Sequence, residues 1–300
     1  MIDLPTLALV LRAAEIHLVF ATVVGLAAWA ATSTRRVSAT TKYWIWVAAS
    51  IAFVLPVGAA VGGLRPPEAD WILPLEDFGT AVARGSALGA VFASVWALGC
   101  LGMVVRLAVR VRACRRAADE TPAVVGLLRP RIVLPDGIGR VLTPPELEAV
   151  LLHERTHALR RDNLIRLVYE IGACVLWFHP IVWLAGSRLS FYRELSCDES
   201  VIRAARGREL VSALVKLANP GETLLLQAGA ASHLADRVSR LSLPRRTSAA
   251  ASGLQAALFA LVVLAGVLGA AFQTNLMQRA ARGEFCTRHA AELAGRPATK

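Results

Sequence analysis

The chain has 300 residues, of which 55% are hydrophobic and only 18% are charged. Because the apolar residues are clustered, this composition excludes an ordinary soluble globular protein and favours a membrane protein. The net charge of +11 would suit nucleic-acid binding, but few of the arginines interleave with aromatic residues. We therefore attribute it to the positive-inside bias of membrane proteins and expect no direct nucleic-acid partner.

Four apolar stretches are long enough, or nearly so, to cross a bilayer core of roughly 30 Å as helices. The first could instead be a signal peptide, but it begins with Asp3 and has no basic residue before Arg12, which is wrong for such a segment. The sequence therefore predicts a mostly α membrane protein with about four transmembrane helices in contact with the lipid bilayer. They cover residues 16–31 (extended back over 4–14), 43–62, 87–105 and 254–272.

The charges between these stretches predict their orientation. Segments 32–42 and 106–116 are basic and contain no acid, whereas segment 63–86 has more acids than bases. The first two should face the cytoplasm and the third the outside, so the N-terminus lies outside. The basic tail then also lies outside, against the charge rule. The predicted domains are a three-helix membrane region (1–110), a cytoplasmic domain (111–250), a fourth transmembrane helix (251–273) and a short extracytoplasmic tail (274–300).

The cytoplasmic domain has the signals of a small α+β fold. Two β-prone runs, 123–127 and 131–134, predict a hairpin. The sequence Thr143-Pro144-Pro145-Glu146 has the form of a capping box and predicts a helix through His157. Further helices are expected over 164–176, 187–206 and 207–218. The apolar stretch 171–186 is interpreted as a buried or membrane-dipping hairpin, and His179 within it as a packed histidine.

The chemistry of the domain is indicated by His153-Glu154-Arg155-Thr156-His157. Residues four apart share one face of a helix, so both imidazoles can reach one ion, and a nitrogen-rich site suits Zn²⁺. Glu154 lies beside the metal, where it can accept a proton from metal-bound water. The motif alone is only moderately specific, because it also occurs as a solvated helix face.

A hydrolytic zinc site needs a third protein ligand, and a predicted helix 37 residues after His157 offers one. Glu194 and Asp198 are four residues apart on it. Glu194 can bind the metal while Asp198 hydrogen-bonds a ligand imidazole from behind. Cys197 is a competing ligand, although it points to another side of the helix. The five cysteines contain no CxxC pair, which argues against a cysteine zinc site.

Several motifs in order resemble the BlaR/MecR type of membrane zinc metallopeptidases, which are antirepressor regulatory proteases of bacteria. The matching pieces are residues 124–135, 150–157, 160–162, 177–183 and 194–198, and the order of three spans, domain and fourth span also matches. The resemblance implies a gluzincin-like zinc protease domain between spans three and four, with His153, His157 and Glu194 as ligands. It also implies a multi-pass protein of the bacterial cell (inner) membrane that cleaves a protein in the cytoplasm.

The substrate expected of such a protease is a transcriptional repressor of the winged-helix type, or the protease itself. Arg245-Arg246, before the fourth span, is a candidate self-processing site, and the alternative interpretation of this pair is a basic membrane anchor. One departure concerns the stimulus: the β-lactam sensors carry a penicillin-binding domain after the fourth span, and the tail here has no Ser-x-x-Lys. Two other functions are open. They are a housekeeping membrane protease of HtpX-like type and a non-catalytic signal transducer, although the intact Glu154 argues against the latter. A homodimer is a possible assembly.

Overall fold

The computed structural model describes residues 4–54, 87–117, 119–217, 237–238, 241, 248–261 and 263–264. The chain divides into two compact units, one of residues 1–24, 55–98 and 260–300 and the other of residues 25–54 and 99–259. The second unit contains every residue that the sequence predicts for the metal site.

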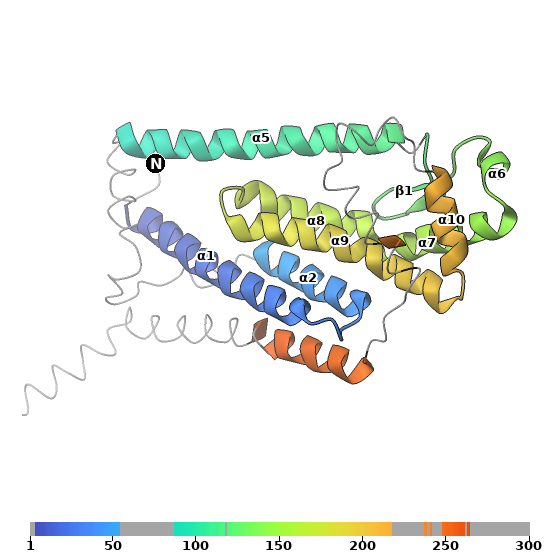
Figure 1. Ribbon diagram of the computed structural model, residues 1–300. Coiled ribbons are helices and arrows are strands. Elements are labelled where there is room, and N and C mark those ends of the chain that lie inside the picture. Colours follow the sequence, from blue (N-terminus) through green and yellow to red (C-terminus); the bar gives the residue numbers. More distant parts are fainter. Residues whose placement is uncertain are drawn as a thin grey trace, which may run out of the picture. The chain divides into compact units, whose positions relative to one another are not determined.

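The described part of the chain is mostly helical, as predicted (Figure 1). A two-stranded antiparallel hairpin pairs Val124 with Ile132, which confirms the predicted strands. The elements are α1 (Leu4–Ser33), α2 (Ala39–Val54), α5 (Ala87–Ala117), β1 (Ala123–Val125), β2 (Arg131–Val133), α6 (Ile138–Val141), α7 (Pro144–Arg160), α8 (Asp162–Val175), α9 (Pro180–Arg203) and α10 (Gly207–Leu217).

One of the described helices is long and apolar enough to cross a membrane, by length and composition: Ala90–Arg116 within α5. Two shorter apolar helices, His17–Ser33 and Ala249–Leu261, coincide with parts of the first and fourth predicted spans. The described residues do not include the last part of the second predicted span, the end of the fourth, segment 63–86, the tail or Arg245-Arg246. The number of spans and their orientation therefore stay predictions.

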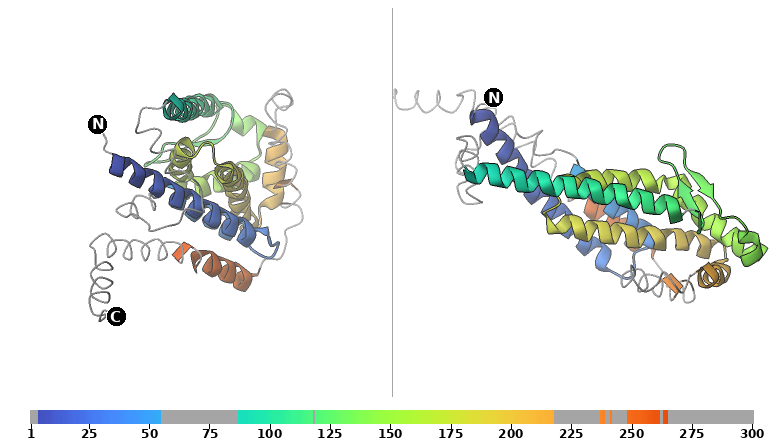
Figure 2. Two further views of the ribbon diagram at one scale, coloured as in Figure 1. Left: turned by 90° about the vertical axis from the view of Figure 1, so that its left-hand side faces the viewer. Right: turned by 90° about the horizontal axis from the view of Figure 1, so that it is seen from above.

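In the second unit, α8 and α9 form an antiparallel pair, and α2 packs against both (Figures 1 and 2). Tyr43 and Trp46 of α2 are fully buried. The first turn of α2 is capped by a side chain of α9: Glu199 accepts hydrogen bonds from the backbone N–H of Ala39 at 2.5 Å and of Thr40 at 3.1 Å. Because the first N–H groups of a helix have no partner within it, this carboxylate satisfies donors that would otherwise be unpaired.

The helix that carries the HExxH motif begins as predicted. Thr143 is its N-cap, proline follows, and Glu146 completes a capping box by accepting from the Thr143 backbone N–H at 2.7 Å. Glu146 also accepts from Ser212 and Lys216 of α10, which ties α7 to α10. An apolar core lies among α6, α7, α9 and α10; it contains Ile138, Leu142, Ala149, Val150, Val201, Leu210, Ala213 and Leu241.

The predicted start of α9 at Ser187 is wrong, because the helix begins at Pro180. Proline is well suited to the first helical position, where its missing N–H needs no partner. The residue before it, His179, acts as the N-cap: its Nδ1 accepts a hydrogen bond from the Ile181 N–H at 3.3 Å. The stretch that the sequence presents as an interrupted apolar hairpin is therefore the turn between two long helices.

Candidate metal centre

Helix α7 presents both histidines of the HExxH motif toward one point. The rings of His153 and His157 are perpendicular neighbours, with centroids 4.8 Å apart, and their Nε2 atoms lie 3.1 Å from each other. Both rings are nearly buried, with 6% of the His153 side chain and 12% of the His157 side chain exposed. The four-residue spacing thus produces the shared face expected of a helix.

Helix α9 brings Glu194 to the same point. Its Oε2 lies 3.5 Å from Nε2 of His153 and 3.8 Å from Nε2 of His157. The other oxygen, Oε1, accepts two hydrogen bonds from the Arg193 guanidinium, at 3.0 and 2.8 Å. Burial raises the pKa of Glu194, but Arg193 and the histidines outweigh burial and hold it well below its usual range. Glu194 therefore presents one charged oxygen to the histidines.

Behind His157 lies Asp162, which the sequence reasoning did not assign to the site. Its Oδ2 is 2.6 Å from Nδ1 of His157, and its Oδ1 accepts from the Tyr43 hydroxyl at 2.7 Å. The contact depends on Arg161, a left-handed residue with φ 55° that ends α7 and lets α8 begin immediately. Positive φ is uncommon for residues other than glycine. The available signal was an acid at a helix start only five residues after His157.

Behind His153 lies Asp198, as the sequence predicts. Its Oδ1 is 3.1 Å from Nδ1 of His153, although the ring is turned so that the contact is poorly aligned for a hydrogen bond. Asp198 is held by Arg237, whose Nε and Nη2 donate to its two oxygens at 2.8 and 2.9 Å. Arg237 also lies 3.6 Å from Oε2 of Glu194. The sequence-based prediction gave this arginine no role at the site.

The donor atoms fit a metal ion. Nδ1 of His157 is hydrogen-bonded to Asp162, which places the ring proton there and leaves Nε2 with a lone pair. Asp198 lies in the equivalent place beside His153 and would act in the same way once that ring is aligned with it. Two lone pairs and a carboxylate oxygen then converge within 3.1 to 3.8 Å of one another. Such an arrangement is stabilised by a metal ion between the three atoms, or by a proton on one ring, which makes the contact between the two Nε2 atoms a hydrogen bond. For zinc with bonds of 2.0–2.1 Å in a tetrahedral site, ligand atoms should be about 3.3 Å apart.

Cys197 is an alternative third metal ligand. Candidate ligand atoms of His153, His157 and Cys197 all lie within 4.8 Å of one another. Its Sγ, however, is 3.4 Å from Nδ1 of His157, the nitrogen that Asp162 occupies, and it accepts a hydrogen bond from Arg160 at 2.9 Å. A metal on that side would have to displace Asp162. The geometry therefore favours Glu194 over Cys197 as the third ligand.

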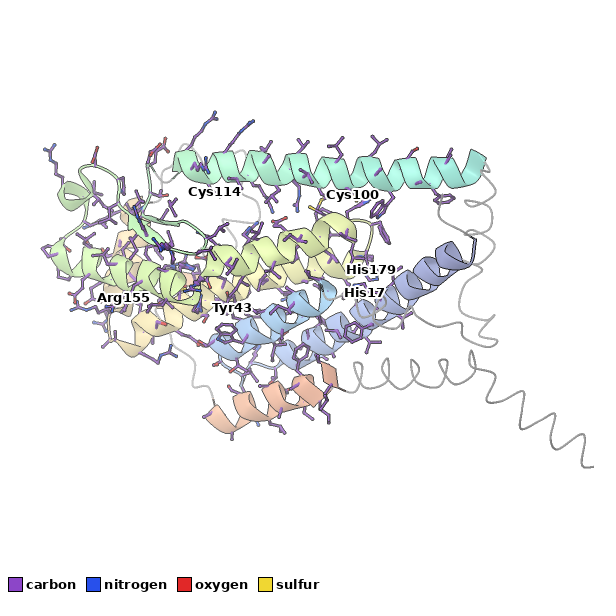
Figure 3. All side chains as sticks on the ribbon, turned by 180° about the vertical axis from the view of Figure 1, so that it is seen from behind. His17, Tyr43, Cys100, Cys114, Arg155 and His179 are labelled. Atoms are coloured by element: carbon purple, nitrogen blue, oxygen red, sulfur yellow. The ribbon has the colours of Figure 1, made fainter. Side chains whose placement is uncertain are left out.

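Glu154 is partly buried on α7 beside the two histidines. Burial raises its pKa and so does the nearby Glu194, while His153 and His157 lower it, and the net effect is an increase. A carboxylate with a raised pKa is a better proton acceptor in a reaction near neutral pH. His179 lies far from this site: Figure 3 shows it at the turn between α8 and α9, at the opposite end of the pair from Arg155 of α7.

Comparison with known proteins places the site within a described family. Residues 107–241 match the family model "BlaR1 peptidase M56". The chain is 33% identical over 99 residues to the regulatory protein BlaR1 of Bacillus licheniformis, which covers 33% of the chain and 16% of that relative. It is 27% identical over 90 residues to the methicillin resistance mecR1 protein of Staphylococcus aureus, covering 30% and 15%. The similarity thus spans about a sixth of those relatives. No solved structure matches.

Proposed function

Because the chain belongs to the BlaR/MecR-type family of M56 peptidases, we propose that it is a membrane-embedded zinc metalloendopeptidase. The observation that carries this proposal is the convergence of Nε2 of His153, Nε2 of His157 and Oε2 of Glu194 within 3.8 Å. These three atoms would hold Zn²⁺ and leave a fourth position open. Glu194 is the most exposed of the three, with 26% of its side chain accessible, so we expect that position to open on its side.

The chain's own residues support hydrolysis of a peptide bond. Bound zinc would supply a Lewis acid that polarises the carbonyl and acidifies a water molecule. Glu154 takes the proton from that water and later delivers it to the leaving amine. Asp162 and Asp198 hold the two imidazoles in the orientation and tautomer that keep Nε2 free. Arg237 fixes Asp198, and Arg193 turns Glu194 so that Oε2 is the oxygen offered.

The proposed substrate is a protein in the cytoplasm, either a winged-helix transcriptional repressor or the protease itself. The proposed location is the bacterial inner membrane, with several spans and the site on the cytoplasmic side. Among the described residues, the helix that is long and apolar enough to cross a membrane ends in a basic segment, 106–116, that precedes the peptidase domain directly. Positive charges beside a span favour the cytoplasmic side.

Zinc content of the detergent-purified chain tests the proposal. We expect about one zinc per chain in the wild type and none in His157→Ala, because two remaining ligands do not hold the ion. Cys197→Ser should keep its zinc and Glu194→Gln should lose most of it. The opposite pattern, with zinc lost from Cys197→Ser and kept in Glu194→Gln, would assign the third ligand to the cysteine. Absence of zinc from the wild type would refute the metal site.

Asp162→Asn should weaken zinc binding by about 10- to 100-fold, the usual effect of removing a carboxylate behind a ligand histidine. The amide can still contact Nδ1 of His157, but it does not carry the charge that fixes the ring proton. Competition with a fluorescent chelator measures the affinity. Asp136→Asn, an exposed acid in the loop before α6, is the matched control and should leave the affinity unchanged. Equal zinc affinities in both variants would show that Asp162 does not contribute to zinc binding.

A further inference from the structure

A second charged cluster lies away from the metal ligands, around Glu170 of α8. This carboxylate is fully buried and accepts from three guanidinium groups, each at 3.1 Å: Arg106 and Arg110 of α5 and Arg166 of α8. Their side chains are 30%, 48% and 33% exposed, respectively. Each guanidinium therefore donates to Glu170 from one of its nitrogens, and its other N–H groups can donate to another acceptor.

The positive charge of this cluster is not balanced. Three guanidinium groups share the single charge of Glu170, and α5 carries no acid anywhere along its length. A fourth arginine, Arg193, lies nearby. Burial of Arg166, together with the positive charges of Arg193 and Arg110, lowers the pKa of Arg166. Arg193 itself is paired with Glu194, whose charge would be drawn toward a bound metal. The cluster thus has an excess of about two positive charges, which favours an anion.

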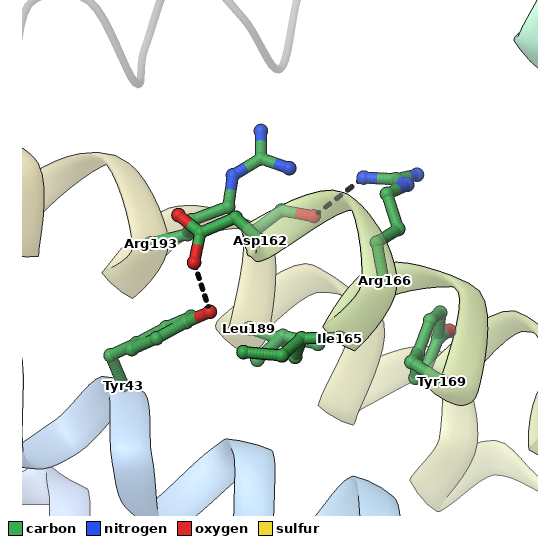
Figure 4. A pocket seen from close by; sticks show the side chains of 8 residues that line it. Tyr43, Asp162, Ile165, Arg166, Tyr169, Leu189 and Arg193 are labelled. Atoms are coloured by element: carbon green, nitrogen blue, oxygen red, sulfur yellow. Dashed lines mark hydrogen bonds between the residues drawn. The ribbon is translucent and has the colours of Figure 1, made fainter. Parts of the chain in front are cut away.

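A pocket opens beside the cluster (Figure 4). Of the four arginines, Arg166 and Arg193 line it and the two of α5 do not, and the carboxylate of Asp162 also lines it. The guanidinium groups of Arg166 and Arg193 project from α8 and α9 on the same side of it. Ser190 also lines the pocket, and its hydroxyl oxygen accepts from Arg166 at 3.4 Å. Leu189 and Ile165 lie deeper in it, and Tyr43 is turned toward Asp162, to which its hydroxyl is bonded. The polar hydrogens that remain available at its rim are thus those of arginine and serine, which is the chemistry that binds phosphate.

The position of the cluster in the fold suggests where the anion comes from. Arg106 is the first charged residue of the apolar part of α5, and it lies over the ring of Trp183 at 5.0 Å. Two turns earlier, Gly99 approaches Trp177 so closely that a Cβ would overlap its ring. The arginines therefore begin where the apolar face of α5 ends, at the level where lipid phosphates lie if α5 crosses the membrane.

We propose that Arg106, Arg110, Arg166 and Arg193, with Ser190, form a binding site for a phosphate group, supplied by the headgroup of an anionic phospholipid or by free phosphate. The arginines of α5 and Glu170 make no contact with the proposed zinc ligands, whereas Arg193 belongs to both sites because it also pairs with Glu194. It joins α5 to α8 through charges, so an occupant would bridge the helix that precedes the peptidase domain and the helix that carries Asp162.

The test uses the full chain in detergent and two probes, phosphatidylglycerol and inorganic phosphate, with phosphatidylcholine as the uncharged lipid. Native mass spectrometry measures retained lipid, and thermal unfolding measures stabilisation by phosphate. Arg110→Gln should weaken phosphatidylglycerol retention about fivefold, the usual effect of one basic residue near anionic lipid. This variant leaves Arg106 and Arg166 on Glu170, so its zinc content should equal that of the wild type.

Arg116→Gln is the matched control, because it removes the same charge from the exposed end of the same helix. Retention of phosphatidylglycerol over phosphatidylcholine, lost in Arg110→Gln and kept in Arg116→Gln, supports the site with lipid as its source. Stabilisation by inorganic phosphate with the same dependence on Arg110, and no lipid preference, supports the site with free phosphate as its source. Equal effects of the two substitutions on both probes would overturn the proposal.

Discussion

Glu154→Gln should lower the rate of proteolysis by about 10²- to 10⁴-fold while the zinc content stays at the wild-type level. The amide has the size of the carboxylate, so the helix and the two flanking histidines keep their places. It does not accept a proton from water, which removes the step that the proposed reaction needs. Cleavage of a co-expressed repressor, or of the chain itself, followed over time beside metal analysis, measures both quantities.

Arg155→Gln is the control for this experiment, since Arg155 is the next residue of α7 and is exposed. It should cleave at the wild-type rate. A Glu154→Gln protein that cleaves as fast as this control would show that Glu154 is not the base. If the wild-type protein itself binds zinc but cleaves neither substrate, the result favours the non-catalytic signal transducer instead.

Glu170→Ala should destabilise the protein by about 3 kcal/mol, the lower part of the range for removing one partner of a buried ion pair. The substitution leaves three guanidinium groups facing one another without the carboxylate that they share. The partial exposure of these arginines lets water compensate some of the loss, which places the effect at the lower end. Thermal or denaturant unfolding in one detergent, at constant protein concentration, gives the value.

Glu148→Ala provides the comparison. Glu148 pairs with Arg206 at 2.7 Å, but 62% of its side chain is exposed, and such surface pairs contribute less than about 1 kcal/mol. The difference between the two variants gives the combined effect of burial and of the two additional arginine partners of Glu170. If both lose the same small amount, the arginines of α5 are not held by Glu170, and the link between α5 and α8 lies elsewhere.

The elements that the sequence predicted well are those with local signals. The capping box fixes where α7 begins, and the two β-prone runs pair as the predicted hairpin of β1 and β2. The start of α9 was missed because Pro180 was interpreted as a break inside an apolar run, whereas it occupies the first helical position. A proline allows both interpretations, and only the packing of the helix distinguishes them.

The surroundings of the metal site were less predictable than its proposed ligands. The histidines, Glu194 and Asp198 follow from helical spacing, and the structure brings all four together, while their roles stay proposals. Asp162 reaches His157 only because one residue adopts a left-handed conformation that its sequence does not require. Arg237 reaches Asp198 across 39 residues of chain, and no periodic pattern connects positions so far apart.

The cap that Glu199 provides to α2 has a consequence for how this molecule can be divided. The acceptor for the first backbone N–H groups of α2 is encoded 160 residues later, on the helix that carries Glu194 and Asp198. A chimaera that exchanges only the N-terminal helices with those of a relative would separate α2 from its cap, whereas one that exchanges α2 and α9 together would keep it. The exchangeable module is therefore a pair of helices distant in sequence, and the N-terminal helices alone are not such a module.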